Sequence, residues 1–245
     1  MGDIVISKKL RRIANRFINR CVNWTKKGHR KVSYSQCGED IIINFILTCL
    51  KIDKPTYMDI GAHHPFRFSN TALFYEAGCH GINIEPDPDL FKLFEKYRKN
   101  DINLNIGISD KPGELLFYIM SSQTMNTFSM QEAEDLVLNH GFVITNKVKV
   151  PVDTISNVVE EYLNGINVDI LSIDVEGLEL QILESIDFTV FSPIVICAET
   201  ISYSTRGLGV KDVALIKFLE NKGYMVYADT YINTIFVQKD RWIDH

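Results

Sequence analysis

The feature that most constrains this chain is a pair of short apolar runs, each carrying an acid at its end. The first run covers residues 57–60, contains Asp59 and is followed by Gly61, and the second covers residues 81–84 and is followed by Glu85. The residues between them have the pattern of a helix. Strand, tight turn, helix and strand form a βαβ unit, and ligands of open α/β sheets bind at the carboxyl ends of the strands. The sequence therefore predicts a ligand site beside the two acids.

The polar groups of this unit suit a cofactor that contains a nucleoside and a cationic end. Gly61 has no Cβ, so the backbone can approach a ligand closely there. Glu85 can accept hydrogen bonds from both hydroxyls of a ribose, and Asp59 would face an amine. A dinucleotide fold instead needs G-x-G-x-x-G, whose second and third glycines are absent. S-adenosylmethionine (SAM), with its ammonium, sulfonium and ribose diol, fits better. Acids placed at strand ends by chance are the alternative interpretation.

Length and composition favour one α/β domain, because 245 residues with 46% hydrophobic content are ample for a single core. No apolar stretch approaches the roughly 20 residues that cross a bilayer. No uninterrupted apolar segment follows the cationic N-terminus, so we expect no secretory signal. The five cysteines are odd in number and lack C-x-x-C spacing. We therefore expect reduced thiols in a cytoplasmic protein.

The charge is distributed unevenly along the chain. Residues 1–31 contain ten Lys or Arg and one acid, a net charge of +9, and because the whole chain is −5, residues 32–245 carry −14. Apolar residues of the first segment recur at helical spacing, with Arg and Asn opposite. We therefore divide the chain into a basic amphipathic N-terminal arm, residues 1–31, and a domain, residues 32–245.

Two partners suit such an arm. A basic amphipathic helix can lie peripherally on an anionic membrane surface, here the inner face. Its apolar stripe can instead pack on the domain or on a second subunit of a homo-oligomer. Nucleic acid is not expected, because the acidic domain would repel a phosphate backbone.

Further polar residues lie in and after the glycine turn. Ser69 or Asn70 suits the N-cap of the first crossover helix, expected over residues 69–78, where free N–H groups can also hold a cofactor carboxylate. A capping role alone is the simpler interpretation. His63 and His64 lie in the turn itself, and adjacent side chains point in different directions, so we expect only one to face the site. Two neighbouring imidazoles are weak support for a metal.

A third strand is expected over residues 102–108, after a second crossover helix over residues 88–98. Ser109 and Asp110 close this strand, at the place where an adenine ring would be held. The pattern then loosens over residues 121–146. An irregular polar segment beside strand ends suits a lid that binds the acceptor, although it can equally be an inert excursion.

Three more acids follow two later strands. Asp174 ends an apolar run, Glu176 lies two residues on, and Glu199 ends the next run. They are expected to converge at the carboxyl edge of the sheet, where clustered carboxylates raise one another's pKa and one can act as a general base. They can also bind a divalent cation, which we regard as the less favoured version. Singly, each can be an acid that a helix N-terminus stabilises. The catalytic candidates are Asp174, Glu176, Glu199 and His63.

The end of the chain predicts a helix over residues 210–222 and an antiparallel pair over residues 224–228 and 234–238. Parallel strands closed by such an edge match a Rossmann-like class I methyltransferase. The expected fold is therefore α/β, with a mostly parallel seven-stranded sheet, an antiparallel edge and helices on both faces.

Four motifs together resemble the FkbM family of SAM-dependent methyltransferases. They are Ser35–Asp40, Asp59–Ala62, Gly81–Pro86 and Ile173–Glu179, in the family's order. The similarity covers roughly residues 33–240, and its most specific part is the Asp-Val-Glu-Gly run. The chain departs from the family at Pro65, where many members have a glycine.

The resemblance implies an O-methyltransferase that acts on hydroxyls of sugars, glycans and related natural products. By this resemblance the methionine end of SAM lies near Asp59 and Gly61, the ribose near Glu85, and the transferring methyl near the Asp-Val-Glu-Gly run. Methyl transfer would be in line, with a carboxylate or His63 removing the hydroxyl proton. A nicotinamide-dependent oxidoreductase and a non-catalytic SAM-binding scaffold are the alternatives. The residues expected to bind cofactor are Asp59, Gly61, Ala62, Asn70, Glu85, Ser109, Asp110 and Asp174.

Overall fold

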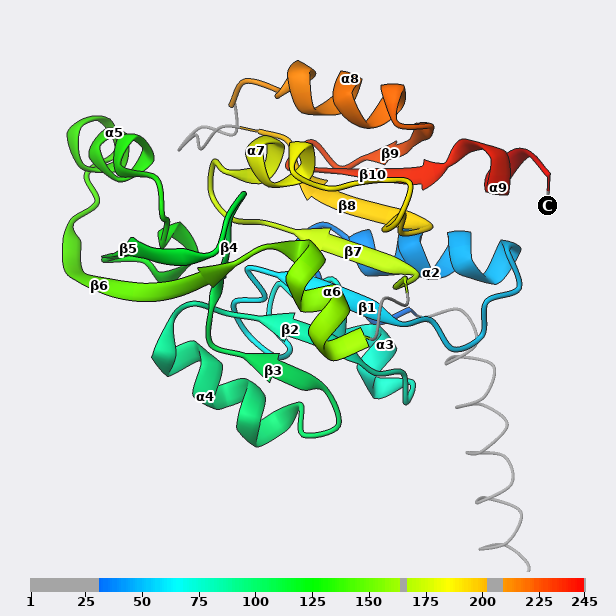
Figure 1. Cartoon of the computed structure of the whole chain (residues 1–245), viewed down its shortest axis with the longest axis horizontal. Helices are drawn as coiled ribbons and strands as arrows, with labels where there is room; N and C mark the ends of the chain where they lie inside the picture. The colour runs from blue at the N-terminus through cyan, green and yellow to red at the C-terminus, as the bar shows by residue number, and fades with distance from the viewer. Residues whose placement is uncertain (1–30, 164–166, 202–208, 245) are drawn as a thin grey trace, which may run out of the picture. The chain divides into compact units, whose positions relative to one another are not determined.

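The computed structural model describes residues 31–163, 167–201 and 209–244 (Figure 1). The chain divides into two compact units, Met1–Val32 and Ser33–His245. The predicted basic arm lies almost entirely outside the described residues, so its helix, its membrane contact and the boundary after residue 31 stay predictions. Within the described ranges, no helix has the length and apolar character needed to span a membrane.

A seven-stranded sheet forms the centre of the larger unit, in the order β3-β2-β1-β7-β8-β10-β9. Neighbouring strands are parallel except in the two pairs that contain β10, which is antiparallel to both β8 and β9. In Figure 1 the β10 arrow points opposite to the β8 arrow. This confirms the predicted fold class. The strands are β1 (Tyr57–Ile60), β2 (Gly81–Ile84), β3 (Ile102–Leu104), β7 (Ile170–Ile173), β8 (Val195–Glu199), β9 (Tyr224–Asp229) and β10 (Asn233–Gln238).

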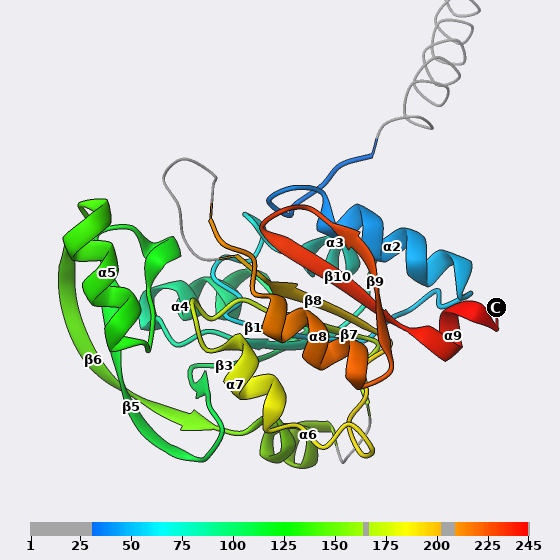
Figure 2. The same ribbon diagram turned by 90° about the horizontal axis from the view of Figure 1, so that it is seen from above.

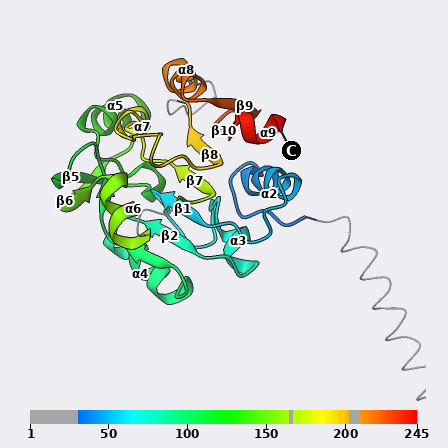
Figure 3. The ribbon, with the colours of Figure 1, turned by 45° about the vertical axis from the view of Figure 1, so that its right-hand side comes forward.

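Helices cover both faces of the sheet, so the central strands β1 and β7 are buried at every position. On one face α6 (Ile155–Leu163), α7 (Glu179–Glu184) and α8 (Val213–Asn221) pack into one apolar cluster. On the other face α2 (Glu39–Cys49) and α3 (Ala72–Glu76) pack into a second cluster. Figure 3 shows α2 and α3 across the strands from α6 and α7.

Two further helices belong to this unit. Asp87 is the N-cap of α4 (Pro88–Tyr97), and its side chain accepts a hydrogen bond from the Asp89 backbone N–H at 2.8 Å. Proline at the first helical position fits the same start. The last helix, α9 (Lys239–Ile243), follows β10 directly.

Two predicted helix starts need correction. The first crossover helix covers only Ala72–Glu76, and its N-cap is Thr71 rather than Ser69 or Asn70. The Ser69 hydroxyl still accepts a hydrogen bond from the Ala72 N–H at 3.1 Å, because the chain bends before the helix begins. The α8 helix likewise begins at Val213, where the Asp212 side chain caps it, and not at residue 210.

The predicted third strand breaks into two strands that belong to different sheets. Its first part is β3, while β4 (Gly107–Ile108) pairs with β6 (Ile144–Asp153) in a three-stranded sheet of order β4-β6-β5. The Asn105 side-chain amide donates to the Glu85 and Pro86 carbonyls at 2.8 and 3.1 Å. The carbonyls that follow β2 are thus bonded by a side chain instead of by a strand backbone, and the chain leaves the main sheet at this bend.

The small sheet belongs to a segment that we call the cap, residues 107–153. It contains β5 (Gly113–Met120), the short 3-10 helix η1 (Gln123–Met125) and α5 (Met130–His140). The cap lies at the end of the molecule toward which β8 points, and Figure 2 shows α5, β5 and β6 gathered at that same end.

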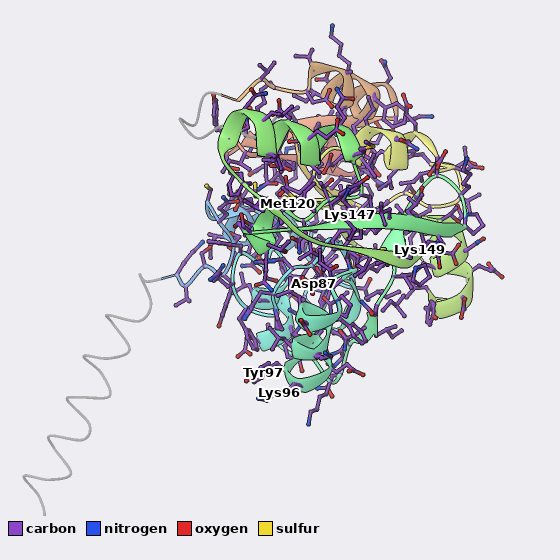
Figure 4. All side chains as sticks on the ribbon, turned by 90° about the vertical axis from the view of Figure 1, so that its left-hand side faces the viewer. Asp87, Lys96, Tyr97, Met120, Lys147 and Lys149 are labelled. Carbon is purple, nitrogen blue, oxygen red and sulfur yellow. The ribbon has the colours of Figure 1, made fainter. Side chains whose placement is uncertain are left out.

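Asn126 and Thr127 attach the cap to the main unit. The Asn126 side chain accepts from the Met120 N–H at 2.9 Å and donates to the Asp87 carboxylate at 3.0 Å. Figure 4 looks onto this side of the molecule and marks both Met120 and Asp87. The Thr127 hydroxyl donates to the Glu176 carbonyl at 2.9 Å. The segment predicted to be a lid is thus bonded to two of the loops that follow the strands.

Candidate active site

A cavity of about 430 Å³ lies at the carboxyl ends of the parallel strands, with the cap forming part of its wall. This volume falls within the range of small-molecule sites. Four cap residues from η1 and the loop after it, residues 123–126, line the cavity, together with Phe117 and Phe128. The predicted site residues that line it are Asp59, Gly61, Ala62, His63, Asn70, Glu85, Asp174, Glu176 and Glu199.

Two predicted cofactor residues, Ser109 and Asp110, do not line this cavity. Gly107 and Ile108, which precede them, line it instead. The break after β3 is the reason, because the Ser109 N–H donates to the Asp153 carbonyl at 2.9 Å within the small sheet. Asp110 is exposed. Near the end of β3 the cavity wall is therefore formed by Gly107 and Ile108, and not by the polar side chains of Ser109 and Asp110, which the sequence predicts to contact an adenine ring.

Glu85 is a buried carboxylate at the end of β2, 5% exposed. One of its oxygens accepts from the His63 N–H at 2.7 Å and the other from the Asp87 N–H at 2.7 Å. Burial raises the pKa of Glu85 to about 8, although these two hydrogen bonds lower it. Both oxygens are thus fixed in position, and each keeps a lone pair that can accept a hydrogen bond from a ligand hydroxyl.

Asp59 lies on β1 opposite Ser172 of β7, and its carboxylate accepts from the Thr71 hydroxyl at 2.7 Å. Arg98, fully buried, donates to the same hydroxyl at 3.2 Å. Burial raises the pKa of Asp59, while the hydrogen bond from Thr71 and the Arg98 charge oppose that rise. The Thr71 hydroxyl therefore links the Asp59 carboxylate to the buried Arg98 guanidinium through two hydrogen bonds.

Arg98 belongs to a buried ionic network beneath this end of the cavity. Its guanidinium donates to Asp101 at 2.9 Å, to the Tyr57 hydroxyl at 2.9 Å and to the Pro65 carbonyl at 3.0 Å. It also lies 4.5 Å from the centre of the Tyr75 ring. The network ties the glycine turn to β1 and to the end of α4.

Gly61 is required for packing within the fold, and its predicted close approach to a ligand stays a prediction. Its φ is +73°, and a Cβ at this position would overlap the backbone carbonyl of Asp174. The absent side chain therefore permits the close approach of the loop after β7, which carries the acidic cluster.

Asn70 lies between the two ends of the cavity. Its side-chain amide donates to the Ser172 hydroxyl at 3.2 Å and lies 3.6 Å from the Cys197 sulfur. The residue does not cap α3, and it reaches across β7 to β8 instead. Its position fits a role in the cavity wall.

Asp174, Glu176 and Glu199 converge as predicted, with carboxylate oxygens within 4.8 Å of one another. Burial raises the pKa of Asp174 to about 6, and a hydrogen bond from Glu199 opposes the rise. Burial and then the neighbouring carboxylates raise the pKa of Glu176 and Glu199 well above their usual range. The cluster therefore holds protons near neutral pH and can exchange them with a bound ligand. Among the described residues, this cluster is the group with the geometry to hold a metal ion.

The loop that carries Glu176 is held by a residue to which the sequence analysis assigns no role. The Glu179 carboxylate, 7% exposed, accepts from the Val175 N–H at 2.7 Å and from the Gly177 N–H at 3.0 Å. Glu176 between them has a φ of +56°, a costly conformation for this residue type. The sequence contains a signal for this role, because Glu179 is the last acid of the Asp-Val-Glu-Gly-Leu-Glu run and lies close enough to bond the backbone of the same loop.

His63 is the histidine of the adjacent pair that lines the cavity, as the divergence of neighbouring side chains predicts. Burial, with the nearby Arg67 charge, lowers the pKa of His63 to about 4. Its imidazole is neutral at pH 7 and a weaker base than the carboxylates. The His64 ring nitrogen accepts from the Phe66 and Arg67 N–H groups at 3.1 Å, so it shapes the turn.

Glu39 and Gln36 at the start of α2 have separate roles. Gln36 lines the cavity, whereas Glu39 is buried and accepts from the Thr230 hydroxyl at 2.7 Å and the Asn233 amide at 3.2 Å. Asn233 faces Glu199 across the β8–β10 pair. Glu39 thus fixes the β9–β10 turn beside the acidic cluster.

Comparison with protein families decides the class. A model of the methyltransferase FkbM domain matches residues 59–226. The chain belongs to the FkbM family. It is therefore a SAM-dependent methyltransferase, and the FkbM match covers the glycine turn, the cap and all three acids of the cluster. A search of curated proteins finds no match.

Several solved methyltransferases are similar in structure at low sequence identity. A precorrin-6y C5,15-methyltransferase from Geobacter metallireducens is 15% identical, with 81% of this chain and 87% of that chain covered and a TM-score of 0.39. A 1,6-didemethyltoxoflavin-N1-methyltransferase from Burkholderia thailandensis is 10% identical, with 97% and 91% covered and a TM-score of 0.39. The Podospora anserina methyltransferase PaMTH1 is 11% identical, with 98% and 100% covered and a TM-score of 0.42.

The cavity residues fit SAM on chemical grounds. The fixed Glu85 carboxylate suits a ribose diol, and the buried Asp59 suits an ammonium or sulfonium nearby. Ile84, Leu90 and Ile108 supply an apolar wall for a purine ring.

Proposed function

We propose that this FkbM methyltransferase transfers a methyl group to a hydroxyl of a sugar, a glycan or a related natural product. The observation that carries the proposal is the cluster of Asp174, Glu176 and Glu199 at one end of a cavity whose other end suits SAM. A hydroxyl acceptor must lose its proton, and carboxylates with raised pKa values are the groups that can take it.

Glu85, Asp59 and Asn70 would hold the cofactor, with Gly61 and Ala62 forming the turn beneath it. SAM, when bound, supplies a methyl group on a sulfonium, which is already a strong electrophile. The protein's work is then to align the acceptor oxygen and to receive its proton. The residues at the ends of β1 and β2 would bind the cofactor, and those at the ends of β7 and β8 would face the acceptor.

Within the cluster, Asp174 and Glu199 share a hydrogen bond and hence a proton. Because the pKa of Asp174 is raised only to about 6, while the pKa values of Glu176 and Glu199 are raised well above their usual range, Asp174 is the carboxylate best placed to accept the hydroxyl proton at pH 7. His63 is the weaker candidate, because its low pKa makes it a poor base at pH 7.

A divalent cation on the same three carboxylates is a second candidate. It is favoured by their oxygens lying within 4.8 Å of one another, and a cation there would lower the pKa of a bound hydroxyl. Chelation with EDTA separates the two versions, because only the metal-bound version would lose stability when the cation is removed.

Calorimetric titration with S-adenosylhomocysteine (SAH), with NADH in parallel, tests the class of cofactor. We expect SAH to bind at micromolar concentration and NADH not to bind. Binding of NADH alone would favour an oxidoreductase, and methyl transfer to no hydroxyl in a glycan panel, despite SAH binding, would favour a non-catalytic module.

A cytoplasmic enzyme with residues 1–31 on the inner face of the membrane would reach lipid-linked or surface-glycan precursors. The charge of +9 in this segment supports that location. Flotation with anionic vesicles tests it, and deletion of residues 1–31 should abolish flotation. Equal flotation of the shortened protein would contradict membrane contact through this segment.

A further inference from the structure

Backbone strain in the described residues is concentrated around the cavity. Five residues other than glycine have a positive φ, and four of them line the cavity. Such conformations are rare for large side chains and persist where the surrounding structure imposes them, often at functional sites. The four are His63, Phe68, Glu176 and Tyr231; the fifth, Lys51, does not line it.

Two of these strained residues are exposed aromatics. Phe68 has a φ of +57° and is 47% exposed, and Tyr231 has a φ of +78° and is 45% exposed. The Arg67 guanidinium lies 5.1 Å from the centre of the Phe68 ring. Both side chains thus present apolar surface to the cavity mouth at a backbone cost that packing in the core does not explain.

Tyr231 lies beside the acidic end of the cavity, and Phe68 lies next to Asn70, between the two ends. Phe68 is two residues before Asn70, whose amide reaches Ser172 and Cys197 on β7 and β8. Tyr231 lies in the β9–β10 turn, two residues before Asn233, which faces Glu199. The turn is held by Asp229, whose carboxylate accepts from the Tyr231 N–H at 2.7 Å.

We propose that Phe68 and Tyr231 bind the pyranose ring of the acceptor and thereby select a sugar as substrate. This rests on the proposed function and assigns its acceptor subsite. The C–H face of a pyranose packs on an aromatic ring, while its hydroxyls need polar partners. Gln36 and the carboxylate of Glu199 line the same cavity and supply them.

A flat phenol is a poorer match for this mixture of groups. It has one hydroxyl to offer, so the remaining amide and carboxylate groups would lose water without gaining a partner. A pyranoside satisfies several of them at once and keeps one hydroxyl for the cluster of acids.

The positive φ angles of Phe68 and Tyr231 make glycine the substitution that best separates loss of the ring from loss of stability. Glycine relieves the strain at Phe68 and Tyr231 while removing the ring, so Phe68→Gly and Tyr231→Gly should keep their thermal stability and lose acceptor binding. Lys51→Gly is the matched control, because Lys51 has a φ of +58° and does not line the cavity.

The experiment uses the full chain saturated with SAH and saturation-transfer NMR with methyl glycosides of glucose, galactose, mannose, fucose and rhamnose, beside phenol and catechol. We expect at least one pyranoside to bind through its ring C–H protons. Each aromatic variant should weaken that binding by about fivefold or more. Lys51→Gly should not change it, and all variants should keep their affinity for SAH.

Undiminished pyranoside binding in both aromatic variants would overturn the proposal, as would binding of the phenols alone or of none of the probes. Failure of the unmodified protein to bind SAH is a different result, which would overturn the proposed function and the acceptor subsite with it. Calorimetry with SAH is therefore run first.

Discussion

The two ends of the cavity hold their acids in opposite ways. At the end of β2, Glu85 is fixed by two backbone N–H donors, and Asp59 is linked through Thr71 to the buried Arg98. At the ends of β7 and β8 the three acids chiefly face one another. Acids with fixed donors and a nearby cation suit ligand binding, whereas acids that raise one another's pKa suit proton transfer. The difference separates cofactor binding from chemistry within one cavity.

Replacing Arg98 by methionine tests the fixed end and has the largest expected effect. The substitution keeps most of the side-chain volume but leaves Asp101 buried without its cation, at a cost of about 3 kcal/mol in the free energy of unfolding. Urea denaturation measures it. Lys149→Met is the control, because its ion pair with Glu114 is exposed and should be worth under about 1 kcal/mol. Equal losses in the two variants would contradict a structural role for the network.

The pH dependence of stability tests the acidic end. Because the pKa of Asp174 is raised to about 6, and those of Glu176 and Glu199 are raised too, the folded state holds protons that the unfolded state has already lost above pH 5. The free energy of unfolding should therefore fall from pH 5 to pH 8, by about 1 kcal/mol from Asp174 alone, and Glu85 and Glu179, with pKa values raised to about 8 and about 7, add to the same fall.

Glu199→Gln should flatten this dependence, since it removes one acid and relieves the repulsion on the other two. Urea denaturation at both pH values checks the prediction, with Glu184→Gln, an exposed acid of α7, as control. A slope unchanged by Glu199→Gln would show that Glu199 does not titrate with a raised pKa in the folded protein, which would contradict the proton-holding cluster.

Glu179→Gln tests how the loop after β7, which carries Glu176, is held in place. One of its two backbone hydrogen bonds should be lost, at a cost of about 1 to 2 kcal/mol. Hydrogen exchange at the Val175 and Gly177 amides should accelerate about tenfold, while SAH affinity stays within about threefold. Unchanged exchange at both amides would show that Thr127 alone fixes the loop.

Removal of metal has the smallest expected effect. If the acids act without a cation, EDTA should change neither the melting temperature nor the affinity for SAH, and Mg²⁺ or Mn²⁺ should not restore anything. A rise of several degrees in the melting temperature with 1 mM Mg²⁺, lost in Glu199→Gln, would instead support the metal-bound version.

The sequence predicts the fold well because its two strongest signals are local. Apolar runs ending in Asp59 and Glu85, and later in Asp174 and Glu199, mark parallel strands, whose carboxyl ends must share one edge. That geometry brings together every catalytic candidate.

The errors arise where tertiary contacts override local pattern. Residues 102–108 read as one strand, but Asn105 ends the pairing and β4 joins the small sheet, which displaces Ser109 and Asp110 from the cavity. The packing of Gly61 against the Asp174 carbonyl, a contact between positions far apart in sequence, has no local signature either. The positive φ angles of Phe68 and Tyr231 have no signature in sequence at all.

Titration of SAH into Glu85→Ala and Glu199→Gln, side by side, is the most direct test of a cavity with a binding end and a chemical end. Loss of the Glu85 carboxyl group should weaken SAH by about tenfold or more, as expected when two hydrogen bonds from a ribose lose their buried partner. Glu199→Gln should leave the affinity within about threefold of the unmodified protein. Equal weakening in both variants, or a larger loss in Glu199→Gln, would contradict the division between the two ends.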